Sequence, residues 1–105
     1  MPIFIGISRH SPESCAMFNE KAKKVALELM DKLEGLARKH GVKVIGGWNV
    51  PSEHLIIVVF DAPSGEAFQK FGMEPELIAW DAYATTEWKS AVSLEEVTKM
   101  LKQAK

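Results

Sequence analysis

Two histidines, one cysteine and one glutamate stand out in this sequence because their side chains can bind a transition metal. They are His10, Cys15, Glu53 and His54. Imidazole and thiolate ligands suit zinc, copper or iron, and three protein ligands leave one coordination position open. Glu53, or Glu13 near the cysteine, can complete the ligand shell or act as a base. We therefore predict a metal site here, able to support redox or isomerase-type chemistry.

The spacing of these residues leaves other interpretations open. His-x4-Cys is not a standard zinc-finger or ribbon spacing, and each histidine can simply cap a turn or hydrogen-bond to it. Cys15 can instead be a nucleophilic or redox thiol, because a helix N-terminus and the nearby His10 stabilise its thiolate. It can also be a buried small apolar side chain. Catalytic roles for His10, Cys15 and His54 therefore depend on whether the fold brings them together.

Alternation and capping signals predict one ferredoxin-like domain over residues 1–105. Strands are expected at residues 2–9, 42–49, 55–60 and 77–86. A helical segment is expected over 11–40 with a break near Phe18-Asn19, a second after the third strand, and a last one behind the capping box at Ser93. The order is βαββαβ plus a C-terminal helix, an α+β fold. Right-handed crossovers then give the strand order 4-1-3-2, with two helices on one face.

This topology predicts that the candidate metal ligands meet at one end of the sheet. The first strand ends at about His10, and the third strand returns antiparallel beside it from Glu53-His54. The first helical segment begins at the same end and carries Cys15. Trp80, expected at the start of the fourth strand, should also lie near that end.

The third strand predicts a dimer because it is apolar at every position from Leu55 to Phe60. Alternate residues face opposite layers, yet two helices on one face leave the other face bare. An exposed apolar sheet favours association, so we expect a second copy packed sheet to sheet, in a dimeric α/β-barrel or a larger oligomer built from it. The alternative is that the C-terminal helix folds over the open face.

An apolar pocket between helices and sheet is the second candidate site. The side chains expected to contact a small apolar or aromatic molecule there are Met17, Trp48, Phe68 and Trp80. Trp48 is expected to share a face of its strand with Val42 and Val44. A histidine at the pocket mouth can act as acid or base. Without such chemistry, we expect a non-catalytic module for ligand binding or assembly. If these aromatic residues only form the core, the chain is a purely structural oligomer.

Composition argues against several classes of partner. Thirteen basic residues stand against fourteen acidic ones, so the net charge of -1 creates no field for nucleic acid or an anionic membrane. The longest apolar run is far too short to span a bilayer. The first residues alternate like a strand and lack the features of a signal peptide. With its single cysteine, the chain is expected in the reducing cytoplasm, without nucleic-acid or membrane partners.

Two segments around the predicted hairpin carry a resemblance to a known family. They are Gly41-Val-Lys-Val-Ile-Gly-Gly-Trp48 and Pro51-Ser-Glu-His-Leu-Ile-Ile-Val-Val-Phe-Asp-Ala-Pro-Ser64. Both resemble the GYD-like group of small prokaryotic proteins, within the dimeric α/β-barrel superfamily. The segments His10-Ser-Pro-Glu-Ser-Cys15 and Ser52-Glu53-His54 are similar to a related uncharacterised family. Because Ser52-Glu53-His54 replaces the expected Gly-Tyr-Asp triplet, the resemblance implies fold and homodimer and leaves function open.

Overall fold

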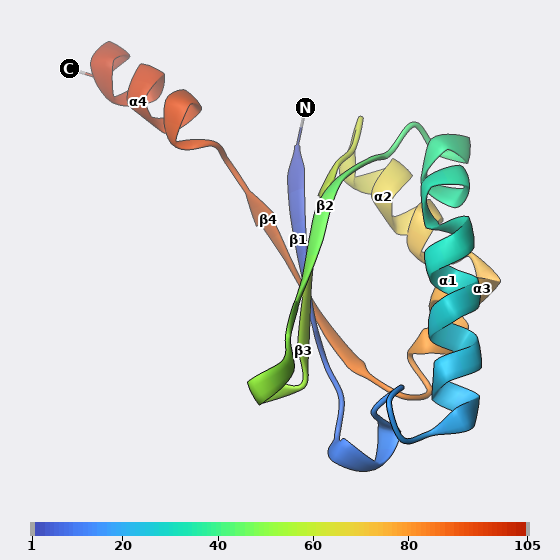
Figure 1. Cartoon of the computed structure of the whole chain (residues 1–105). Coiled ribbons are helices and arrows are strands. Elements are labelled where there is room, and N and C mark those ends of the chain that lie inside the picture. Colours follow the sequence, from blue (N-terminus) through green and yellow to red (C-terminus); the bar gives the residue numbers. More distant parts are fainter. Residues whose placement is uncertain (1, 105) are drawn as a thin grey trace.

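The chain forms a four-stranded antiparallel sheet with helices on one face (Figure 1). The computed structural model describes residues 2–104. The strands are β1 (Ile3–Arg9), β2 (Lys43–Val50), β3 (Leu55–Asp61) and β4 (Thr85–Ala91). The helices are α1 (Glu20–Lys39), α2 (Gly65–Gly72), α3 (Pro75–Trp80) and α4 (Leu94–Gln103), with short 3-10 turns η1 (Pro12–Ser14) and η2 (Pro51–Glu53). The order β2-β3-β1-β4 confirms the expected ferredoxin-like α+β fold.

The predicted break in the first helical segment is confirmed at Asn19. Its side-chain oxygen accepts a hydrogen bond from the backbone N–H of Ala22 at 3.0 Å, so it caps α1. The residues before it form η1 and a turn. Within residues 2–104, no helix combines the length and the apolar composition needed to cross a bilayer.

The prediction of a strand over residues 77–86 is wrong, because residues 75–80 form α3 and β4 begins only at Thr85. Pro75 occupies the first turn of α3, where its missing N–H is not needed, so it starts a helix. Trp80 therefore ends a helix and does not start a strand.

The core lies between the sheet and the helices, around the fully buried Phe60 and Phe71. Their ring centroids are 5.3 Å apart in an edge-on contact. Trp88 of β4 lies over Gly6 of β1, and a Cβ at Gly6 would come within 2.4 Å of the indole Cζ3. The indole is held there by Phe68, whose ring centroid is 5.1 Å away. A glycine is therefore required where β1 passes under this indole.

The opposite face of the sheet is uncovered by any helix of the described chain (Figure 1). It is apolar on β1 and β3 and charged on β4, where Glu87 and Lys89 pair with Ile7 and Ile5. Ile57 pairs with Ile7 on one side and with Trp48 on the other, so these three side chains share that open face. The prediction that Trp48 shares a face with Val44 is wrong, because a β-bulge between Val44 and Gly46 reverses the alternation. The α4 helix does not fold over the open face, since it projects beyond the end of β4.

Glu74 joins the end of α1 to the start of α3. His40 Nε2 donates to its carboxylate at 2.9 Å, and Lys39 Nζ lies 3.3 Å from the same oxygen. These hydrogen bonds, first that from His40, hold the pKa of Glu74 below its ordinary value. The carboxylate contributes to stability only while it is ionised.

Replacing Gly35 by Ala should stabilise the protein, because this exposed glycine lies inside α1 and has no neighbouring atom within 4 Å of the position that a Cβ would take. Helix propensity predicts about 0.5–1 kcal/mol, or a rise in Tm of roughly 3–6 °C. Gly6→Ala should instead destabilise by about 1–3 kcal/mol through overpacking against Trp88. Thermal unfolding compares the two variants, and equal effects would contradict the packing described here.

Glu74→Gln should destabilise the protein near neutral pH, and the difference from wild type should shrink as the pH falls. Because the folded-state pKa of Glu74 is lowered, its contribution is complete above the unfolded value of 4.5 and is lost as the pH falls through the folded-state value. Urea unfolding from about pH 3 to pH 7 measures this. Glu66→Gln is the control, since Glu66 pairs with Lys70 on the exposed face of α2. A pH-independent gap for Glu74→Gln would contradict the assignment.

Candidate metal centre

The pairing of β1 with β3 brings His10 and His54 side by side. The last paired residues are Arg9 and Leu55, and the His10 N–H continues the ladder by donating to the His54 carbonyl at 3.2 Å. The imidazoles then meet directly, with His10 Nε2 3.3 Å from His54 Nδ1. The rings are nearly perpendicular, at 83°. Two residues 44 positions apart in the sequence thus share one site.

The backbone at His54 is strained. Its φ of 50° and ψ of 49° lie in the left-handed region, and it is the one non-glycine residue with positive φ in the described chain, residues 2–104. For a residue with a Cβ this conformation costs about 1–2 kcal/mol. The turn η2 places His54 here as the chain passes from β2 into β3. Histidine at this position costs stability, which points to a role for its imidazole.

Cys15 is positioned by the turn that precedes α1. Its carbonyl accepts a hydrogen bond from the Asn19 N–H at 2.8 Å. The Asn19 side chain caps α1 through Ala22 and donates from Nδ2 to the Glu13 carbonyl at 3.1 Å. One asparagine therefore ties the turn to the helix. Cys15 is 9% exposed, and its thiol is free.

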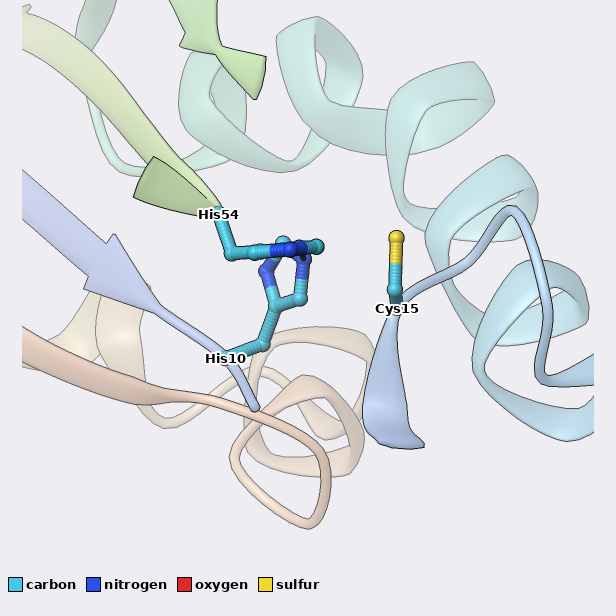
Figure 2. A group of neighbouring side chains, drawn as sticks. All are labelled: His10, Cys15 and His54. Carbon is cyan, nitrogen blue, oxygen red and sulfur yellow. Dashed lines mark hydrogen bonds between the residues drawn. The ribbon is translucent and has the colours of Figure 1, made fainter. Parts of the chain in front are cut away.

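The side chains of His10, Cys15 and His54 point toward a common space (Figure 2). One ligand atom from each lies within 4.8 Å of the other two. In a tetrahedral zinc site, Zn–N bonds of 2.0–2.1 Å place two nitrogens about 3.3 Å apart, and a Zn–S bond of 2.3 Å places sulfur about 3.6 Å from each nitrogen. The histidine pair already matches this spacing. A shift of the thiol by roughly 1 Å completes it.

The surroundings of His10 favour the neutral form of its imidazole. Burial, and then the nearby His54, lower the pKa of His10 below its ordinary value. A neutral imidazole has a lone pair that can bind a metal. His10 Nδ1 is also buried without a hydrogen-bond partner among the described residues. Nδ1 is thus the ring nitrogen without a partner, whereas Nε2 is the one that faces His54.

The predicted glutamate ligands lie apart from this group. Glu53 on η2 and Glu13 on η1 are both exposed, and neither belongs to the set of described side chains with the spacing of metal ligands. The structure thus brings together the histidines and the cysteine of the predicted site without a carboxylate.

A cavity of about 420 Å³ lies between the sheet and the helices. Of the predicted pocket residues, Phe68 and Trp80 line this cavity, whereas Met17 does not and is 82% exposed in the loop after η1. Trp48 does not line it either, since it lies on the open face of the sheet. Sequence reasoning missed Trp88 as a lining residue because the fourth strand was placed too early. Alternation with Thr86 and Ser90 would have marked its inward face.

The end of the cavity nearest to the histidines is polar. Ser8 Oγ accepts hydrogen bonds from Trp80 Nε1 at 2.9 Å and from the Thr86 hydroxyl at 3.2 Å. Ser8 lies in β1 two residues before His10, which directly follows the end of that strand at Arg9. The cavity lining includes Ser8 but none of His10, Cys15 and His54.

Replacing His54 by Gly should remove the imidazole and stabilise the fold, because glycine adopts the left-handed conformation without strain. His54→Ala removes the same imidazole but keeps the strain. Thermal and urea unfolding should therefore rank Gly above Ala by about 1 kcal/mol. Equal stability of the two variants would show that His54 is not strained.

Comparisons with known proteins support the fold and do not identify a family. No family model and no curated protein matches the chain. A solved NIPSNAP domain protein from Burkholderia xenovorans, itself uncharacterised, is similar at a TM-score of 0.61 and 12% identity, over 89% of this chain and 94% of that one. A solved antibiotic biosynthesis monooxygenase has a TM-score of 0.61 and 11% sequence identity, over 89% of this chain and 98% of that one. A putative monooxygenase of that type from Deinococcus radiodurans has a TM-score of 0.59 and 16% sequence identity, over 89% of this chain and 92% of that one. At such identities the likeness shows the fold alone.

Proposed function

We propose that this protein binds a transition metal through His10, Cys15 and His54. The observation that carries the proposal is the convergence of three ligand atoms within 4.8 Å from segments distant in sequence. Support comes from the 3.3 Å separation of the two ring nitrogens, the lowered pKa of His10 and the left-handed backbone of His54.

The donor set favours zinc or copper, with iron as the third candidate. Two imidazoles and one thiolate are intermediate in softness, and they leave a coordination position open for a reacting molecule. A metal held there would polarise a carbonyl, activate water or, as copper or iron, exchange electrons. The side chains of His10, Cys15 and His54 would hold it. Redox or isomerase-type chemistry stays part of this proposal.

Purified, tag-free protein should bind close to one metal ion per chain, measured by elemental analysis after incubation with zinc, copper or iron and removal of excess. His10→Ala, Cys15→Ser and His54→Ala should each lower the affinity by at least about tenfold, because each removes one ligand of a shared site.

His40→Gln is the matched control, since His40 is the chain's remaining histidine and its ring contacts Glu74 instead. Glu53→Gln tests whether a carboxylate joins the site after binding. Absence of binding by wild type, or full binding by the ligand variants, would contradict the proposal.

A second candidate function is the binding of a small apolar or aromatic molecule in the cavity. Its volume of about 420 Å³ is in the range of small-molecule sites, and its walls are largely aromatic and aliphatic. The Ser8 hydroxyl would contact a polar group on such a ligand. This function requires no metal, so binding by metal-free protein distinguishes it from the first.

The proposal also includes a homodimer in the cytoplasm. The open sheet face, with Ile7, Ile57 and Trp48, supports a partner sheet, and the small net charge does not oppose self-association. The free thiol of Cys15 supports a reducing compartment. Membership of the GYD-like group remains a prediction from the hairpin sequence.

A further inference from the structure

The C-terminal helix α4 has an apolar stripe that contacts almost nothing. None of its residues is buried. The stripe consists of Leu94, Val97, Met100 and Leu101, whose exposed fractions are 84%, 37%, 65% and 69%. Ser93 caps the helix by accepting a hydrogen bond from the Glu96 N–H at 3.1 Å. A ten-residue helix is marginal in water even when it is capped, so α4 needs a surface against its stripe.

The position of α4 shows where that surface must lie. In Figure 1 the helix projects past the end of β4, on the side of the sheet away from α1, α2 and α3. The radius of gyration is 15.5 Å, whereas a compact chain of this length has about 13 Å. The projecting arm accounts for this extended shape.

The helix does not cover its own sheet. β4 stays paired with β1 as far as Ala91, opposite Ile3, so its end is fixed. Only Val92 and Ser93 link that end to α4, and the helix beyond them points away from the sheet (Figure 1). The stripe therefore has no partner among the described residues of its own chain.

We propose that α4 docks on a second copy of this chain, with the two copies exchanging their C-terminal helices. This inference rests on the homodimer in the proposed function and adds the segment that fastens it. The helix projects to the side of the open apolar face, so the partner that covers this face also comes within reach of α4. A two-fold axis satisfies both arms at once.

The charges on α4 favour this occupant over others. Two acidic residues, Glu95 and Glu96, are balanced by Lys99 and Lys102. An anionic membrane or a nucleic acid would be recognised by a basic face, which this helix lacks. A neutral amphipathic helix suits a protein surface, and the near-neutral chain itself presents one.

The test is analytical ultracentrifugation of the full chain and three variants over a range of concentrations, with circular dichroism to confirm folding. Leu101→Lys charges the stripe and should raise the dimer Kd by at least about tenfold. Gln103→Lys adds the same charge to the polar side of α4 and should change the Kd by less than about twofold. Trp48→Lys charges the open sheet face without touching α4 and should also weaken the dimer.

The outcomes distinguish the exchange of α4 from the sheet-to-sheet homodimer. If Trp48→Lys dissociates the dimer and Leu101→Lys does not, the helix exchange is wrong and the sheet-to-sheet dimer stands. If wild type is monomeric throughout, both are overturned. Hydrogen exchange adds a second measure, because α4 amides should gain protection only as the dimer forms. Protection that is independent of concentration would mean that α4 packs on its own chain and would overturn the inference.

Discussion

The antiparallel pairing of β1 with β3 is the constraint on which the rest of the molecule depends. Its register pairs Arg9 with Leu55 and so places the next residues on each strand, His10 and His54, in contact. A slip of one residue would turn one imidazole to the other face and end the contact. The same register divides the central strands into a face that forms the core and cavity and a face left open. Site, cavity and open face all follow from one set of backbone hydrogen bonds.

Two features of the candidate metal centre lower the stability of the fold. His54 has a left-handed backbone, and His10 buries a ring nitrogen without a partner among the described residues. Both destabilising features lie at the end of the sheet away from Phe60 and Phe71. The packing of the aromatic core around these two residues offsets their cost. Bound metal would stabilise the folded chain by mass action. Local strain at a group of metal-binding side chains is therefore consistent with selection for binding.

The sequence predicted the strands and helices whose residues follow a regular pattern. It did not predict the places where a single β-bulge or proline changes that pattern. Alternation in β1, the continuous apolar run of β3 and the capping signals predicted the topology, and with it the meeting of His10, Cys15 and His54. The face of Trp48 was mispredicted because the bulge after Val44 adds a residue to β2, which alternation alone does not reveal. Residues 77–86 are of mixed polarity, so they were predicted as a strand, although Pro75 starts a helix there. Because the fourth strand was placed too early, Trp88 was not predicted to line the cavity.

X-ray absorption spectroscopy of the zinc-loaded protein tests the metal centre most directly, because it counts the ligand atoms around the ion. The chain has a single cysteine, so the account predicts one sulfur at about 2.3 Å together with nitrogen or oxygen ligands at about 2.0 Å. Cys15→Ser should remove the sulfur contribution and leave the lighter ligands. A shell of nitrogen and oxygen alone in the wild-type protein would contradict the shared His10–Cys15–His54 site.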